Sequence, residues 1–393
     1  MEWMVDYAQL DDDQKDFVDS EINKDGNIWI KGFAGSGKSV MLIHALRKKL
    51  QESPKSKVCV VVFTHSLIDM FCTGMSQIGL KYRKILNVRD YNEKQNDEIP
   101  IMTYLQFKKI NDNFDYIFCD EVQDLTEGVL QKMRNKSKHV HVAGDSNQSI
   151  YDDTVNTNEI GDIINARSFV LTRIYRLTRS IMNAVSNLMP NMDIFGSRRD
   201  MTKKDVDIRI CQAYDKEEEV KYVFDQGTDA ASEGYSAVVL LPLKEKIIEF
   251  SNIILRLNKK NEWEKTYDRY GNPDWSNLNK HFKTNNINVE YVGNRHGSFE
   301  NASKNNNLII MTYHSAKGMD FDNVFLPFLS DDLYIPGDEK TLFMVAMTRS
   351  RTNLFITYSG YLHHLVEKFE SSCQKISINQ VNNTTQESLD FDF

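Results

Sequence analysis

Residues 28–50 read IWIKGFAGSGKSVMLIHALRKKL, and this stretch decides the fold. Between Gly32 and Ser39 it matches the pattern G-x-x-x-x-G-K-[ST], with a short apolar run before it and an amphipathic run after it. A strand, a glycine-rich loop and a helix in this order form the setting in which the pattern binds phosphate. We therefore expect a phosphate-binding loop here and not an ordinary glycine-rich turn.

The residue types of this loop predict a nucleoside triphosphate as ligand. Small residues let backbone N–H groups close on phosphate at a helix N-terminus, and those expected to do so are Gly32, Gly35, Ser36 and Gly37. Lys38 is expected to reach the β- and γ-phosphates, and the Ser39 hydroxyl to ligate magnesium. The expected cofactors are therefore ATP and Mg²⁺.

A pair of carboxylates follows a second apolar run, in FDYIFCDEVQDL. Asp120 and Glu121 come directly after the expected strand, and a loop at the carboxyl edge of a parallel sheet would face the phosphate loop. We expect Asp120 to hold magnesium and Glu121 to act as the general base. Acidic residues after a strand also serve as turns or helix caps, so this interpretation depends on the phosphate loop beside them.

The remaining sequence alternates β-rich apolar runs with amphipathic stretches, which indicates parallel sheets with crossover helices. We expect an α/β fold with two domains, the first over residues 1–170 and the second over 171–372. The second should carry an Asn-rich insertion near 258–307 with little regular sheet. Residues 373–393 are polar and predict a disordered tail, although its closing SLDFDF also suits docking into a pocket of a partner.

Composition narrows the class of protein. The formal net charge of −8 means that any nucleic-acid surface must be a local basic groove. The five cysteines are scattered, which argues against a disulfide framework and a zinc site and favours a reducing cytoplasm. The apolar runs are too short to cross a bilayer, so no membrane association is expected.

The letters DEVQD resemble the D-E-x-Q-D motif of UvrD/Rep/PcrA-type superfamily 1 helicases. Further stretches resemble that family's motifs in the family's order, among them HVAGDSNQSIY, IYRLTRSI, MTYHSAKGMDFD and VAMTRSRTNLFIT. The resemblance implies two RecA-like domains of the P-loop NTPase kind, with the ATP site in the cleft between them. It also implies an ATP-hydrolysing enzyme that moves on nucleic acid.

The resemblance assigns roles to individual residues of this chain. It implies that Gln14 reads adenine, Tyr175 stacks on it, and Asp320 lies near the ribose, where the family usually has glutamate. Gln148 would sense the γ-phosphate, Arg176 would reach it, and Arg349 would be the arginine finger. Contacts to a single strand are implied for a further group: Phe63, Thr64, His65, Thr103 and His314.

Two departures from the family's pattern leave the function open. Asp153 stands where the family often has an aromatic residue that stacks on a base, and the connections between motifs are too short for large accessory subdomains. The first hypothesis is an ATPase stimulated by single-stranded nucleic acid, DNA more than RNA, with translocase or helicase activity. The alternative is a regulatory switch that controls a partner such as a nuclease. A structural ATP site without turnover is disfavoured by the complete set of hydrolytic residues.

Overall fold

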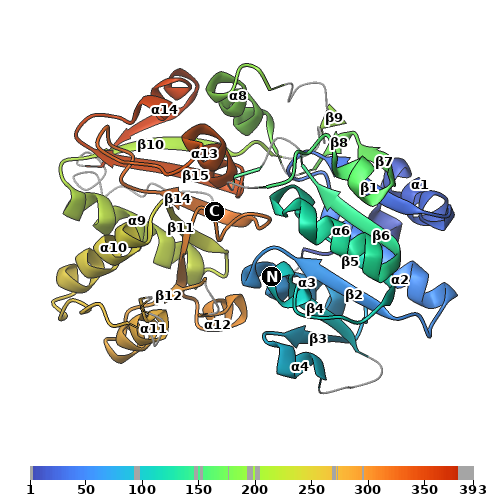
Figure 1. Ribbon diagram of the computed structural model, residues 1–393. Helices are drawn as coiled ribbons and strands as arrows, with labels where there is room; N and C mark the ends of the chain where they lie inside the picture. Colours follow the sequence, from blue (N-terminus) through green and yellow to red (C-terminus); the bar gives the residue numbers. More distant parts are fainter. Residues whose placement is uncertain are drawn as a thin grey trace. The chain divides into compact units, whose positions relative to one another are not determined.

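The chain forms two compact units in the computed structural model (Figure 1). Unit 1 comprises Met1–Arg176 with Gly196–Asp200, and unit 2 comprises Leu177–Phe195 with Met201–Phe393. The structure describes residues 3–92, 98–145, 149–150, 154–175, 177–192, 198–199, 204–267, 271, 273–293 and 296–378.

Unit 1 is built on a parallel sheet. Among the described residues it has seven strands in the order β3-β4-β2-β5-β6-β1-β7. Every neighbouring pair runs parallel, so the carboxyl ends of all the strands lie at one edge. The strands are β1 (Asn27–Gly32), β2 (Val58–Val62), β3 (Tyr82–Ile85), β4 (Ile99–Thr103), β5 (Phe114–Cys119), β6 (Ser137–Gly144) and β7 (Ala166–Leu171).

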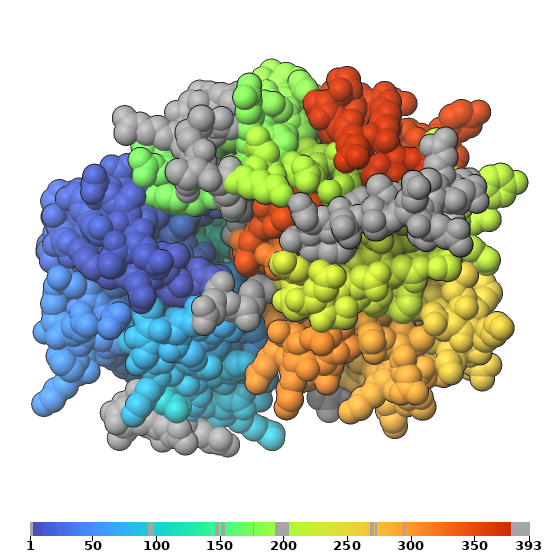
Figure 2. All heavy atoms as spheres, turned by 180° about the vertical axis from the view of Figure 1, so that it is seen from behind, coloured from blue at the N-terminus to red at the C-terminus, as the bar shows by residue number. Residues whose placement is uncertain are grey.

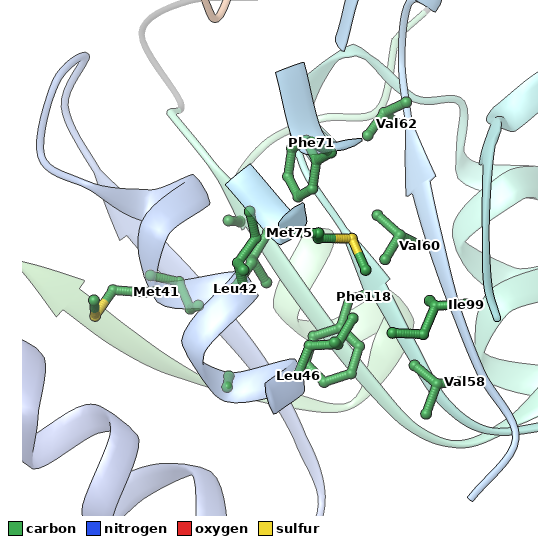
Figure 3. Close-up of a cluster of buried hydrophobic side chains, with 14 of the residues drawn as sticks. Met41, Leu42, Leu46, Val58, Val60, Val62, Phe71, Met75, Ile99 and Phe118 are labelled. Carbon is green, nitrogen blue, oxygen red and sulfur yellow. The ribbon is translucent and has the colours of Figure 1, made fainter. Parts of the chain in front are cut away.

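Helices cover both faces of this sheet. Successive strand residues point to opposite sides, and apolar side chains of β2 are buried on both. Val58, Val60 and Val62 of β2 pack against α2 and α3, whereas Cys59 and Val61 belong to the core on the other face. Figure 3 shows the first of these cores, with side chains of α2 and α3 over β2. The helices are α1 (Asp12–Asp19), α2 (Lys38–Glu52), α3 (His65–Gln77), α4 (Val88–Asn92), α5 (Tyr104–Phe107), α6 (Glu127–Lys136) and α7 (Ile160–Ile164). Two further short strands, β8 (Arg173–Ile174) and β9 (Arg198–Arg199), pair with each other.

Unit 2 repeats this plan with little sequence in common. Its described residues form a second parallel sheet of seven strands, in the order β12-β13-β11-β14-β15-β10-β16. The strands are β10 (Asp207–Ala213), β11 (Ala237–Leu241), β12 (Val289–Tyr291), β13 (Leu308–Thr312), β14 (Phe321–Leu326), β15 (Ser350–Ser359) and β16 (Gln374–Ser377). The helices are α8 (Arg179–Leu188), α9 (Lys216–Ser232), α10 (Lys244–Leu257), α11 (Trp275–Thr284), α12 (Phe299–Lys304), α13 (Glu339–Met347) and α14 (His364–Glu367).

The predicted fold class is confirmed: both units are α/β, RecA-like and built on parallel sheets. The Asn-rich region at 258–307 contains α11, α12 and, among its described residues, the short strand β12. It packs through aromatic side chains, since the Trp275 ring stacks on that of Tyr291 with centroids 4.2 Å apart. None of the helices that the structure describes is both long enough and apolar enough to span a bilayer.

The prediction of a disordered tail from residue 373 is wrong for Gln374–Ser377. These residues form β16, which pairs in parallel with β10 from Arg209↔Gln374 to Gln212↔Ser377. The strand lies at the sheet edge, where its backbone hydrogen bonds decide its structure and its short polar sequence carries no apolar alternation. Residues 379–393, which include SLDFDF, lie outside the described residues.

A buried carboxylate of α9 bonds to strand β15 and to the segment that follows β14 in unit 2. Glu219 is fully buried, and its Oε1 accepts hydrogen bonds from the backbone N–H of Phe328 at 2.6 Å and from Thr357 Oγ1 at 2.7 Å. Phe328 follows β14 with a φ of 65°, a conformation that is unusual for a bulky residue. Burial raises the pKa of Glu219 from its ordinary value of 4.5 to about 7, against the two hydrogen bonds, which lower it.

Replacing Glu219 by Gln should remove a pH dependence of stability. Between an unfolded pKa near 4.5 and a folded pKa of about 7, the folded state binds the extra proton, so the free energy of unfolding falls as pH rises. The glutamine oxygen can accept the same two hydrogen bonds and carries no charge. Between about pH 5 and 8, the free energy of unfolding measured with urea should fall by roughly 1–3 kcal/mol more in the wild type than in the variant. Parallel pH profiles would contradict this.

Candidate functional site

The phosphate loop connects β1 to α2 at the carboxyl edge of the sheet in unit 1. Gly35 and Gly37 adopt left-handed φ values of 76° and 85°, and α2 begins at Lys38 directly after Gly37. A side chain at Gly37 would also collide with Gln14, because an added Cβ would lie 2.7 Å from its Nε2. The loop therefore needs glycine at this position, and it presents the free N–H groups of the first turn of α2.

Lys38 is held across this loop. Its ammonium group donates to the backbone oxygens of Gly32 at 2.9 Å and Phe33 at 3.0 Å, and the side chain is largely buried. Ser36 is fully buried, and its Oγ has no hydrogen-bond partner among the described residues. The loop thus concentrates a cation and unused donors, which is the equipment that an anionic ligand requires.

Ser39 and Asp120 meet beside the loop although 81 positions separate them in the chain. The Ser39 Oγ donates to Asp120 Oδ2 at 2.5 Å. Asp120 follows β5 and Ser39 lies in the first turn of α2, so the parallel sheet brings them together. A hydroxyl and a carboxylate are oxygen ligands of the kind that Mg²⁺ takes, so these two residues fit a magnesium site.

Glu121 is positioned by an unusual backbone and by Gln123. Its φ of 53° is left-handed, and its backbone N–H donates to Asp120 Oδ1 at 3.0 Å. Gln123, in the short 3-10 helix Val122–Asp124, donates from Nε2 to Glu121 Oε2 at 2.5 Å and accepts from the backbone N–H of Asp145 at 3.1 Å. Residues held in sparsely populated backbone regions concentrate at functional sites, which agrees with a reactive Glu121.

Two adjacent buried carboxyls raise an electrostatic difficulty. Asp120 is 1% exposed and Glu121 is 7% exposed. Burial, with the charge of Glu121 as the next cause, raises the pKa of Asp120 to about 6, while the hydrogen bond from Ser39 and the charge of Lys38 lower it. The site therefore has an excess of negative charge that a bound cation would relieve.

The residues assigned to adenine lie beside the same loop. Gln14 caps α1 together with Asp11, since the Gln14 backbone N–H donates to Asp11 Oδ1 at 2.8 Å, and its side chain reaches Gly37. Tyr175 donates from its backbone N–H to Gly35 O at 2.8 Å and from its hydroxyl to Asp11 Oδ2. The structure thus brings Gln14 and Tyr175 together at the loop, and their contact with adenine stays a prediction.

Four of the residues assigned to a nucleic-acid strand gather at the ends of β2 and β4. Val62 and Thr103 are paired in register, so the residues that follow them are neighbours. The Phe63 ring stacks on Tyr104 with centroids 5.0 Å apart. Thr64 caps α3 by accepting from the backbone N–H of Leu67 at 3.3 Å, and His65 is the first residue of that helix. Thr103 is buried, and its Oγ1 has no partner among the described residues.

Arg349 belongs to unit 2, where its guanidinium group is bonded within the unit. It donates to Val345 O at 2.7 Å, to Met319 O at 3.1 Å and to Thr348 Oγ1 at 2.8 Å. These bonds fasten the end of α13 to the loop before β14. Its predicted role as an arginine finger concerns a ligand of unit 1 and stays a prediction.

The other assigned residues of unit 2 lie between β13 and β14. Asp320 Oδ2 accepts from Arg351 Nε at 2.9 Å, so this carboxylate already has a structural partner. His314 is partly buried, and burial together with the charge of Lys317 lowers its pKa. Gln148, Arg176 and Asp153 lie outside the described residues.

The sequence interpretation missed two residues of this site. Gln123 belongs to the quoted DEVQD motif, but the sequence does not show that its side chain donates a hydrogen bond to Glu121. Only the fold shows this contact. Asp11 binds both Gln14 and Tyr175. The capping-box spacing of Asp11 and Gln14 was visible in the sequence and marks the start of a helix, but it gives no sign of Tyr175.

Comparison with protein families finds two matches. Residues 279–361 match the UvrD-like helicase C-terminal domain. Residues 7–147 match the family described as Type III restriction enzyme, res subunit. The first match lies in unit 2, and the second covers the phosphate loop and the two carboxylates.

Comparison with individual proteins finds helicases. A provisionally named ATP-dependent DNA helicase of Acanthamoeba polyphaga mimivirus is 26% identical over 72% of this chain and 40% of its own length. A provisionally named DNA helicase II homolog of Mycoplasma capricolum subsp. capricolum is 24% identical over 57% of this chain and 32% of its own. The chain therefore spans well under half of either relative. Among solved structures, the helicase of PRRSV is similar with a TM-score of 0.43 and 14% identity, over 87% of this chain and 54% of that one.

Replacing Gly144 by Ala should disturb the support of Glu121. An added Cβ would lie 2.4 Å from Gln123 Oε1 and 2.8 Å from Val122 Cγ1. Both groups are buried, so the free energy of unfolding should fall by roughly 1–3 kcal/mol. Thermal denaturation measures this, with Gly128→Ala in α6 as the control, since a Cβ there meets nothing within 4 Å. Equal melting temperatures for the two variants would show that Gln123 is not held as described.

Proposed function

We propose that the chain is a UvrD-like superfamily 1 helicase, in line with its family matches and relatives, and that it hydrolyses ATP, with Mg²⁺, in response to single-stranded nucleic acid. The observation that carries the proposal is the meeting of Ser39, Asp120 and Glu121 at the phosphate loop. DNA is the preferred strand, because the relatives are named as DNA helicases. The free cysteines suit a reducing cytoplasm.

The residues of unit 1 divide the chemistry among them. Lys38 and the N–H groups of α2 bind the phosphates, and Ser39 with Asp120 holds magnesium, which would offset the charge of the phosphates when bound. Glu121 takes a proton from the attacking water, and Gln123 keeps its carboxylate in place. Gln14 and Tyr175 provide the adenine side of the site.

Unit 2 supplies the arginine finger of the proposed reaction. Arg349 stabilises the charge that spreads over the γ-phosphoryl oxygens, a role in which a guanidinium contributes about 10³ to 10⁵ in rate. To do so it must exchange some of its present bonds to Val345, Met319 and Thr348 for bonds to phosphate. From unit 1, Arg176 and Gln148 complete the set at the γ-phosphate. In unit 2, Asp320 lies near the ribose and His314 contacts the strand.

Strand separation by this chain alone is the weaker part of the proposal. Between α3 and β5 the described residues hold just two short strands and the helices α4 and α5, which leaves no inserted subdomain to grip a duplex. The same observation favours a second candidate, a switch in which ATP controls binding to a partner such as a nuclease. The two candidates share the ATP site and differ in their response to nucleic acid.

Variants of the two central residues should separate binding from turnover. Lys38→Ala should weaken nucleotide binding, because a phosphate-binding cation is lost. Glu121→Gln should keep nucleotide binding and lower turnover by about 10² to 10⁴, because the general base is lost. Titration with a fluorescent ADP analogue and a phosphate-release assay measure these. Full ATPase activity in either variant would show that the site is wrongly assigned.

Nucleic acid should distinguish the two candidate functions. Single-stranded DNA should raise the ATPase rate severalfold, and the stimulation should fall as salt increases, because phosphate contacts release counterions. Parallel assays with no polymer, single-stranded DNA, duplex DNA and RNA measure it, followed by strand displacement on tailed duplexes. An ATPase without stimulation at low salt would favour the switch.

A further inference from the structure

A cavity of about 750 Å³ lies in unit 1 at the edge of the sheet opposite the phosphate loop. Its lining comes from segments that lead into strands β2, β3, β4 and β5 and from the first residues of these strands, such as Lys55 to Val58, Gly79 to Lys81 and Glu98 to Pro100. The phosphate loop follows a strand, whereas these segments lie at the amino ends of strands of the same parallel sheet. The cavity is therefore separate from the site already described. The chain around the end of α2 and the start of β2 projects from the surface of unit 1 beside it (Figure 2).

The charge of this cavity is opposite to that of the chain. Four basic side chains line it, against two acidic ones, Glu98 and Asp112, whereas the whole chain carries a net charge of −8. Asp112 is neutralised locally, since Lys57 Nζ lies 2.5 Å from its Oδ2. Lys55 and Lys81 are exposed, and neither has an ion-pair partner among the described residues. Two cations are thus available to a ligand.

The wall of the cavity is held by a hydrogen-bonded cluster. Asp112 Oδ2 accepts from the Tyr91 hydroxyl at 2.8 Å as well as from Lys57. Arg83 Nη1 donates to the backbone oxygen of Asp90 at 2.8 Å, which fixes the guanidinium group at the start of β3. Leu80 and Ile99 add apolar lining between these polar groups. The cavity is thus organised without a ligand and has the mixed lining typical of small-molecule sites.

We infer that this cavity is a second binding site of unit 1, for a phosphate-bearing nucleotide. The volume falls within the range of roughly 300–1,000 Å³ found for small-molecule sites. Phosphate groups would lie against Lys55, Lys81 and Arg83, and the base would lie against Tyr91 and Leu80. The same chemistry is offered by a free nucleotide and by the phosphorylated end of a strand. The inference is independent of ATP hydrolysis at the phosphate loop.

A competing explanation of the lysines must be separated by experiment. The helices α2 and α3 end at Glu52 and Gln77, just before Lys55 and Lys81, and cations near a helix C-terminus stabilise it through the helix dipole. In that case the lysines would contribute to stability and not to binding. Melting temperatures of the same variants decide between these explanations.

The test uses the full chain with its phosphate loop filled by saturating ADP and Mg²⁺. Thymidine 3′,5′-bisphosphate is titrated by calorimetry into the wild type, into Lys55→Glu with Lys81→Glu, and into the matched control Lys260→Glu with Lys304→Glu. The control reverses two exposed lysines of unit 2 and makes the same change in net charge. We expect the cavity variant to bind at least about tenfold more weakly and the control to bind as the wild type does.

A second arm identifies the source of the nucleotide. A short oligothymidylate with a 5′-phosphate is compared with the same strand without it, in the same three proteins. If the bisphosphate does not bind but the cavity variant alone loses the preference for the phosphorylated strand, the site takes strand ends. If the cavity variant melts lower, Lys55→Gln with Lys81→Gln replaces it. Equal binding of both ligands by cavity variant and control would overturn the inference.

Discussion

The register between β6 and its two neighbours is the constraint on which the site of unit 1 depends. Val142 of β6 is paired with Trp29 of β1 on one side and with Cys119 of β5 on the other. Because all three strands run parallel, the segments that leave β1 and β5 emerge at the same edge of the sheet. The strand β5 ends at Cys119, opposite Val142, and β1 continues three residues past that level to Gly32. The bond between Ser39 and Asp120 follows from this alignment. A slip of one residue would turn these side chains to the wrong faces.

The same alignment lowers the stability of unit 1. Asp120 and Glu121 are adjacent, buried and of like charge, and Glu121 stands in a backbone conformation that non-glycine residues rarely adopt. Their hydrogen bonds from Ser39 and Gln123 offset part of this penalty. A domain selected for stability alone would place apolar residues here. Unit 2 has a comparable buried acid in Glu219, but there the carboxylate is bonded to Phe328 and Thr357 and serves the packing of the fold.

Local patterns in the sequence were enough to predict the fold class, the strand, loop and helix around Gly32 to Ser39, and the positions of Asp120 and Glu121 after a strand. They succeeded because glycine spacing and strand ends are encoded within a few residues. The strand β16 was not predictable, because its pairing with β10 joins residues 165 positions apart, Arg209 and Gln374 among them. The contact of Tyr175 with Asp11 was missed for the same reason, since it spans 164 positions. The basic cavity was not predicted either, because its lysines come from separate segments of the chain that lie close together only in the fold.

The link between Tyr175 and Gly35 has a mechanical meaning. Tyr175 is bonded through its backbone to the phosphate loop, and unit 2 begins two residues later at Leu177. The first of the chain's three passages between the units therefore begins next to a residue that is hydrogen-bonded to the phosphate loop.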